Sequence, residues 1–215
     1  GYLGISGLVR ILAFFKVITW LIFLAEPGFG SKLMLDFQYV FQGEVWRLVS
    51  FMLIPGAVNP FILLIEVMFL LMIGEGLEQA WGAFGVTAYI VGSALCGILV
   101  AFVMSAFFKY PFLLNTAIYS SLLMAASCLY PDMIIQLMLV IPVKLKYVGM
   151  LAAGWVLSDV FRMSETLGAF LALGLPMLAC LIPFVLVFVP RLIRGAKQRG
   201  EVAARRGRFE RAKLP

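Results

Sequence analysis

Long apolar runs, separated by short segments rich in glycine, proline and charge, occupy most of the chain. A helix that crosses a bilayer needs about 20 predominantly apolar residues, and six runs are candidates for such helices. The pattern therefore predicts an all-α membrane protein, a six-transmembrane-helix bundle. The expected spans are about Leu8–Ala25, Pro60–Ile73, Phe84–Phe107, Phe112–Leu129, Lys144 or Lys146 to Val160, and Thr166–Val189.

Turn-forming segments predict where these helices end. Residues 26–28 (Glu-Pro-Gly) end the first span, residues 74–78 (Gly-Glu-Gly-Leu-Glu) the second and residues 130–132 (Tyr-Pro-Asp) the fourth, because proline and glycine disfavour the helix interior. The sixth span is expected to bend at Pro176 or Pro183. The first span has no small-residue cleavage site, so we do not expect it to be a cleaved signal peptide.

Two further segments are too polar or too short to span. Residues 27–59 mix charges with aromatic and apolar pairs, which predicts a long first loop lying partly in the headgroup region. Within it, Trp46 and Arg47 are typical of a headgroup anchor, and Glu44 is available to pair with the arginine. The apolar segment Met133–Pro142 is too short to span, so it is expected to be re-entrant or interfacial.

Composition indicates that lipid is the solvent for most of the chain. Of 215 residues, 63% are hydrophobic and 13% are charged, and the mean hydropathy is +1.05; soluble domains have about 45–50% apolar and about 25% charged residues. Such a surplus cannot be hidden inside one soluble core. We expect one membrane domain, residues 1–190, and a basic cytoplasmic tail, residues 191–215.

Positive charge is concentrated at the C-terminal end and predicts the orientation. The net charge is +6, and nine of the 17 lysines and arginines lie in residues 191–215. With six spans, one side of the membrane holds 13 of them and the other side four, so the positive-inside rule puts both termini in the cytoplasm. A solvated tail next to membrane lipids explains these charges without nucleic acid. Arg10 and Lys16, in the first span, are expected to snorkel towards the nearby headgroups.

The chain lacks the residues that several kinds of active site require. It has no histidine, the usual base that activates a serine hydroxyl, and the HExxH, GxxxxGK[ST] and GxGxxG motifs are missing. Among the lysines, only Lys16 lies deep enough in a span to serve as a desolvated base. No metal or cofactor is expected, because the cysteines lie in apolar runs without CxxC spacing and read as packing residues; they are Cys96, Cys128 and Cys180.

Two groups of polar residues inside the spans are candidates for function. Ionisable side chains within a bilayer are costly and are functional candidates by default. Glu66, in the second span, is either a polar site for a partner segment, ion or proton, or a structural acid bonded to a neighbour. Asn115, Thr116 and Ser120, early in the fourth span, either join helices by hydrogen bonds or line a cavity. Together with Glu66 they form one candidate polar cavity.

Three motifs follow one another along the chain: GEVWRLVSF at residues 43–51, GxxxExxxG at residues 74–82 and IPVKLKY at residues 141–147. In this order they resemble the G-x-x-W-R-L-x-[ST]-x block, the turn into the third span and the I-P-[VI]-K-x-[KR]-[WY] block of the rhomboid family of intramembrane serine proteases. The resemblance covers about Leu8 to Val189 and implies a rhomboid-like six-helix fold. The residues that carry it are Trp46, Arg47, Gly74, Glu78, Gly82, Lys144 and Lys146.

The same resemblance implies that the catalytic positions are replaced. Rhomboid proteases carry a G-x-S-G nucleophile at the start of the fourth span and a histidine at the head of the sixth; the equivalent positions here are Thr116 and Thr166. The oxyanion-side histidine and asparagine of the second span fall at Ile62 and Glu66. This implies a catalytically inactive member, a pseudoprotease. Because residues 141–147 look like the bacterial-type pattern, the expected location is a bacterial inner membrane.

The leading hypothesis is therefore a non-catalytic rhomboid-like membrane protein that binds transmembrane helices of client proteins. One alternative is an atypical rhomboid protease that uses Thr116 or Ser120 with an unrecognised base. A second alternative is a small transporter or channel that uses Glu66.

Overall fold

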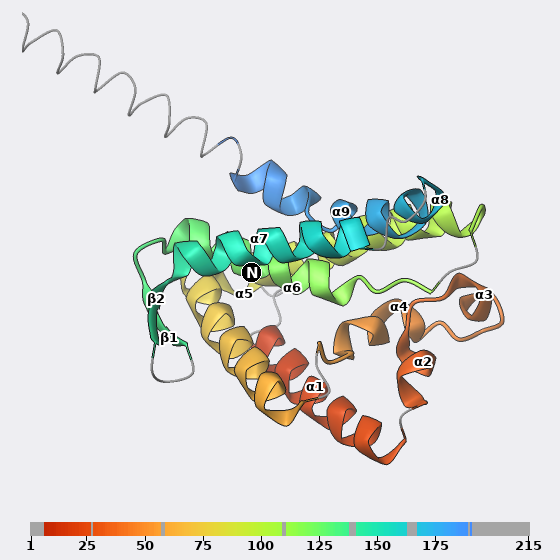
Figure 1. Ribbon diagram of the computed structural model, residues 1–215, viewed down its shortest axis with the longest axis horizontal. Helices are drawn as coiled ribbons and strands as arrows, with labels where there is room; N and C mark the ends of the chain where they lie inside the picture. Colours follow the sequence, from red (N-terminus) through yellow and green to blue (C-terminus); the bar gives the residue numbers. More distant parts are fainter. Residues whose placement is uncertain are drawn as a thin grey trace, which may run out of the picture.

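The computed structural model describes residues 7–26, 28–56, 59–108, 111–137, 141–162, 167–188 and 190. Most of these residues are helical, as the apolar pattern predicts (Figure 1). The elements are α1 (Leu8–Ala25), α2 (Phe29–Leu33), α3 (Phe37–Val40), α4 (Arg47–Ser50), the 3₁₀ turn η1 (Phe51–Leu53), α5 (Pro60–Ser105), α6 (Asn115–Leu129), β1 (Ile134–Leu137), β2 (Ile141–Lys144), α7 (Leu145–Arg162), α8 (Leu167–Ala169), the π-helical turn η2 (Phe170–Gly174), α9 (Leu175–Ala179) and a last helix, Ile182–Phe188.

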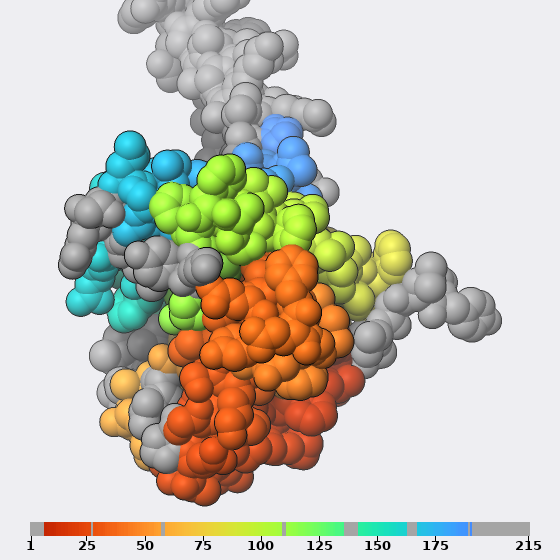
Figure 2. Space-filling view, turned by 90° about the vertical axis from the view of Figure 1, so that its right-hand side faces the viewer, coloured from red at the N-terminus to blue at the C-terminus, as the bar shows by residue number. Residues whose placement is uncertain are grey.

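The helices form two groups that α5 connects (Figure 1). In the first group, α1 packs against the part of α5 that precedes Gly82; in the second, α6 packs against α7 and the later part of α5 packs against α9. Helix α6 lies at the centre, with Ala117, Ile118 and Leu122 fully buried. The first loop lies against the chain leading into α6 (Figure 2), where the Phe112 amide donates to the Leu35 carbonyl over 2.7 Å.

Helix α5 continues beyond the point at which the sequence predicts an end. It passes through residues 74–78 and breaks only at Gly82, whose φ of 72° is left-handed. Gly74 lies inside the helix, where a Cβ would overlap the Val9 side chain of α1. The predicted end of the second span is wrong because a helical glycine costs only about 1 kcal/mol relative to alanine, and the close approach of α1 requires a small residue here.

The six predicted membrane spans are not all established by helix length and composition. Among the described residues, α1 and α5 are long and apolar enough to cross a membrane, and a third span follows if Leu167–Ala179 and Ile182–Phe188, bent by 44°, are taken as one. This bend lies between the two prolines at which it is expected. Helix α6 has only 15 residues and α7 carries charges near both ends. A mostly helical membrane protein is confirmed, and a six-span bundle is not.

The segment between α6 and α7 departs from the all-α prediction. At Met133–Pro142, the segment expected to be re-entrant or interfacial, β1 and β2 form an antiparallel hairpin in which Ile134 pairs with Lys144 and Ile135 with Val143. β-branched residues favour this pleated conformation, and a run this short is ambiguous between strand and helix from its apolar character alone.

The buried side chain of Arg47 stabilises the first loop through hydrogen bonds to three of its residues. Its side chain is only 4% exposed; Nε donates to Glu44 over 2.6 Å, and Nη1 donates to the carbonyls of Ser31 and Met34 over 2.7 and 3.0 Å. The predicted pairing with Glu44 is present, but a headgroup-anchoring role for Arg47 is wrong because the loop encloses the guanidinium. Trp46, by contrast, remains exposed.

Glycine sets the contact between α6 and α7. A Cβ on Gly149 would overlap the Ser127 side chain of α6 and approach the Met124 backbone, whereas a Cβ on Gly154, on the same helix, meets nothing within 4 Å. The two helices therefore pack closely at Gly149, whereas Gly154 is exposed.

Replacing Arg47 is expected to destabilise the first loop. Arg47→Ala leaves Glu44 and two carbonyls without their donor, which costs about 2–3 kcal/mol and lowers the thermal unfolding midpoint in detergent micelles. The control is Lys32→Ala, which removes the exposed ion pair with Glu26 in the same loop and should cost about 0.5 kcal/mol or less. Equal midpoints for the two variants would contradict the buried role of Arg47.

The two glycines of α7 make a matched pair of substitutions. Gly154→Ala is expected to raise the unfolding midpoint, since alanine is favoured over glycine by about 1 kcal/mol in a helix. Gly149→Ala is expected to lower it despite the same propensity gain, because α6 must move. The measurement is thermal unfolding in micelles, and stabilisation by Gly149→Ala would refute the close packing of α6 and α7.

Candidate functional site

A buried ion pair joins α1 to α5 at the centre of the first span. Lys16 is the ninth of the 18 residues of α1, about 12 Å along the axis from either end at 1.5 Å per residue. Its ammonium donates to the Glu66 carboxylate; the lysine side chain is 0% exposed and the glutamate side chain 25%. The expectation that Lys16 snorkels is wrong, because the headgroups are far from this depth and Glu66 lies beside it.

Arg10, the other charge of the first span, behaves as expected for an end position. It lies near the start of α1, is exposed, and pairs with exposed Glu75 of α5 over 2.9 Å. The two ion pairs between α1 and α5 thus differ in burial.

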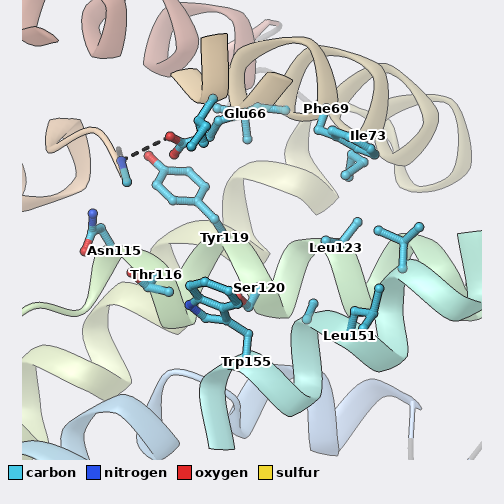
Figure 3. Close-up of a pocket in the computed structure, with 15 residues that line it drawn as sticks. Glu66, Phe69, Ile73, Asn115, Thr116, Tyr119, Ser120, Leu123, Leu151 and Trp155 are labelled. Carbon is cyan, nitrogen blue, oxygen red and sulfur yellow. Dashed lines mark hydrogen bonds between the residues drawn. The ribbon is translucent and has the colours of Figure 1, made fainter. Parts of the chain in front are cut away.

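Hydrogen bonds fasten the end of the first loop over the ion pair. The Gly56 amide donates to the second carboxylate oxygen of Glu66 over 3.0 Å (Figure 3). The Tyr119 hydroxyl donates to the Met52 carbonyl over 2.6 Å, and the side-chain amide of Asn115 donates to the Ile54 carbonyl over 3.0 Å. Residues 52–56 are thereby bonded to both α5 and α6.

The Tyr119 ring provides a second partner for the ammonium. Nζ of Lys16 lies 3.8 Å from the ring centroid, a distance typical of a cation–π interaction. Lys16 therefore contacts a carboxylate and an aromatic face, which together replace the water that a buried ammonium lacks.

Next to this pair lies a cavity of about 430 Å³ between the first part of α5, α6 and α7 (Figure 3). Its walls are mostly apolar and include a few polar side chains. The lining residues are Gly56, Ile62, Glu66, Phe69, Leu70, Ile73, Asn115, Thr116, Tyr119, Ser120, Leu123, Val148, Leu151, Ala152 and Trp155.

The cavity opens sideways between α5 and α7. Ile62 on α5 and Leu151 and Trp155 on α7 line it, yet more than half of each side chain is exposed. Helix α5 is long and apolar enough to cross a membrane, and apolar side chains exposed beside such a helix suit contact with lipid. The mouth of the cavity is therefore bordered by exposed apolar side chains.

Two hydroxyls line the cavity from α6. Thr116 and Ser120 are one helical turn apart, and within the described part of the chain neither side chain has a hydrogen-bond partner. Figure 3 shows them on the α6 side, with Glu66 on the α5 side. Ser121, the next residue, points away and is buried against Tyr89, whose hydroxyl donates to the Ser121 carbonyl over 3.1 Å.

The structure brings together all four residues of the candidate polar cavity: Glu66, Asn115, Thr116 and Ser120 line the same space. Thr166 lies outside the described residues. Sequence reasoning missed that Lys16 is the partner of Glu66. The signal for it was a lysine too far from either helix end to reach a headgroup, matched by an acid at similar depth in the next span.

The remaining motif residues have structural positions away from the cavity. The Glu78 carboxylate accepts the Gly7 amide over 2.8 Å at the start of α1, and Gly74 and Gly82 shape α5 as described. Lys144 pairs with Asp132 over 3.3 Å on the exposed hairpin, and Lys146 lies 4.9 Å from the Tyr147 ring centroid.

The polar groups that line the cavity can donate and accept hydrogen bonds. Its ionisable lining residues are Glu66 and Tyr119, and both already bond to the protein. Lys16 does not line the cavity. Among the described residues, no three Cys, Asp or Glu side chains converge as metal ligands.

Comparison with known proteins adds one finding. A family model described as a eukaryotic integral membrane protein (DUF1751) matches residues 6–189, which include the first loop, the cavity and the bent last span. No curated protein and no solved structure matches the chain.

The expected bacterial inner membrane is wrong, because the matching family is eukaryotic. That expectation came from residues 141–147, which form β2 and the first turn of α7.

A double-mutant cycle on Lys16 and Glu66 is expected to show strong coupling. Glu66→Gln leaves a fully buried ammonium without its counter-ion and should cost about 3 kcal/mol. Lys16→Met should cost less, because Glu66 keeps the Gly56 amide and some exposure. The double variant should recover most of the loss. Unfolding midpoints in micelles, converted to free energies, measure the cycle.

The matched control is the exposed pair between the same two helices. Arg10→Met and Glu75→Gln are expected to couple by about 0.5 kcal/mol or less. Additive effects of Lys16→Met and Glu66→Gln, like those of the control, would show that the buried pair does not hold α1 and α5 together.

Proposed function

The chain belongs to the DUF1751 family of eukaryotic integral membrane proteins, and from this premise we propose that it is a non-catalytic, rhomboid-like protein that binds transmembrane segments of other membrane proteins. The binding site is the cavity between the first part of α5, α6 and α7. The observation that carries the proposal is a laterally open apolar cavity with polar groups inside it.

Helix association in lipid favours such a site. Lipid tails are as apolar as leucine side chains, so helices associate in membranes through close packing and interhelical hydrogen bonds rather than through the hydrophobic effect. The cavity offers both, since Thr116 and Ser120 lie behind a mouth of apolar side chains.

The size of the cavity suits part of a helix. A helix with its side chains is about 10–12 Å across, whereas a space of about 430 Å³ holds a few side chains. A partner helix would therefore lie across the mouth, against Ile62, Leu151 and Trp155, and insert side chains.

The rhomboid resemblance agrees with this placement. Thr116, which takes the position of the rhomboid nucleophile, lines the cavity, and so do Ile62 and Glu66, which take the positions of the oxyanion-side residues. The replacement of the catalytic groups that the resemblance implies supports a site that binds without cleavage.

The non-catalytic part of the proposal rests on the bases available. The sequence has no histidine, and Lys16 is bonded to Glu66 and covered by Tyr119 rather than directed at a hydroxyl. A carboxylate beside Thr116 and Ser120 would also repel a developing oxyanion. Neither alternative, the atypical protease or the transporter, gains support from this arrangement.

Site-specific photo-crosslinking tests the proposal. A photoreactive amino acid at Leu151, at the mouth, is expected to crosslink to transmembrane segments of other membrane proteins in eukaryotic membranes, identified by mass spectrometry of the crosslinked peptides. The matched control at Leu99, an exposed position on the later part of α5, is expected to give lipid adducts. Ser120→Leu, which narrows the cavity and removes a hydroxyl, should reduce the protein crosslinks from position 151 severalfold, and Ser105→Leu should not.

Two results would count against the proposal. Crosslinks of equal yield from positions 151 and 99, or crosslinks unaffected by Ser120→Leu, would remove the cavity as the binding site. Cleavage of a membrane-embedded peptide that stops with Thr116→Ala or Ser120→Ala would overturn the non-catalytic part.

A further inference from the structure

We infer that the cavity selects partner helices that carry an uncharged hydrogen-bonding side chain, above all the carboxamide of glutamine or asparagine, at the depth of Glu66. This rests on the proposed function, since it names the class of segment that the proposed site takes. Three features of the described residues carry it: the neutrality of the ion pair, the spare hydroxyls and the depth of the site.

The first feature is charge. The two ionic groups at the site, Lys16 and Glu66, are in direct contact, so their charges cancel. A lysine or glutamate entering the cavity would bring a charge without a counter-ion into a mostly apolar space, which is strongly unfavourable. The ion pair therefore disfavours charged guests of either sign.

The second feature is the set of hydrogen-bonding groups. A carboxylate has about four lone-pair sites; Glu66 uses one oxygen for Lys16 and the other for Gly56, so it can still accept. Thr116 and Ser120 each offer a donor and acceptors that are not used within the described residues. A carboxamide matches this set, because its NH₂ group can donate to Glu66 and its oxygen can accept from the hydroxyls.

The third feature is depth. Glu66 contacts Lys16, which lies at the middle of α1, so the polar groups lie far from the headgroups. A glutamine at this depth in a free helix has few hydrogen-bond partners in lipid, and moving it into the cavity satisfies it. A leucine gains nothing comparable, because lipid and the cavity walls are equally apolar to it.

A host–guest peptide series tests the inference. The host is a 21-residue leucine-rich transmembrane peptide with leucine, glutamine, lysine or glutamate at its central position, labelled for energy transfer to the protein in phosphatidylcholine vesicles. The glutamine peptide is expected to bind about tenfold more tightly than the leucine peptide, which corresponds to about 1.4 kcal/mol. The lysine and glutamate peptides are expected to bind more weakly than the glutamine peptide.

Variants of the cavity hydroxyls test whether these groups cause the preference for the glutamine peptide. Thr116→Val with Ser120→Ala is expected to reduce the advantage of the glutamine peptide over the leucine peptide to about twofold or less. Ser105→Ala, which removes a hydroxyl outside the cavity that donates to the Phe102 carbonyl, is the control and should change no affinity.

The outcomes separate this inference from the proposed function. Equal binding of the glutamine and leucine peptides, both lost with Ser120→Leu, would overturn the selectivity and leave the binding of transmembrane segments intact. Tightest binding of the lysine peptide would show that Glu66 acts as an anionic receptor, which also overturns the inference. If none of the peptides binds, the proposed function fails as well.

Discussion

The contact between Lys16 and Glu66 is the constraint around which the site is built. A lone ammonium or a lone carboxylate at mid-membrane depth is costly, so each of these residues requires the other. Their contact brings α1 against the first part of α5, and the Gly56 amide bonds the end of the first loop to the same carboxylate. This ion pair thus connects two helices and a loop that are distant from one another in sequence.

The same contact decides the character of the cavity. An unpaired Glu66 would make it an anionic site suited to a cation or a proton. With Lys16 behind it and the Tyr119 ring over the ammonium, the site is neutral but still able to accept hydrogen bonds. The proposed recognition of a neutral polar side chain in a membrane helix rests on that neutrality, and the hydroxyls of Thr116 and Ser120 add the donors that a carboxylate lacks.

The rest of the molecule supports this arrangement by close packing and by internal hydrogen bonds. Gly74 allows α1 to pack closely against α5, and Gly149 allows α7 to pack closely against α6. These close contacts fix the positions of the helices around the cavity. The first loop contributes through Arg47, whose bonds to Glu44 and to two carbonyls keep a polar segment folded beside apolar helices. The cavity stays open between α5 and α7, where the exposed side chains of Ile62, Leu151 and Trp155 line it.

The sequence by itself determined the helical membrane character, the positions of most helices and the polar residues that meet in the cavity, because apolar runs and intramembrane polar groups are local signals. It did not determine where α5 ends, the hairpin at residues 134–144, or the burial of Arg47 and Lys16. Those were decided by tertiary structure: a glycine stays helical where α1 packs on it, a short apolar run becomes strands where it can pair with itself, and a charge remains inside a membrane protein where a distant residue neutralises it.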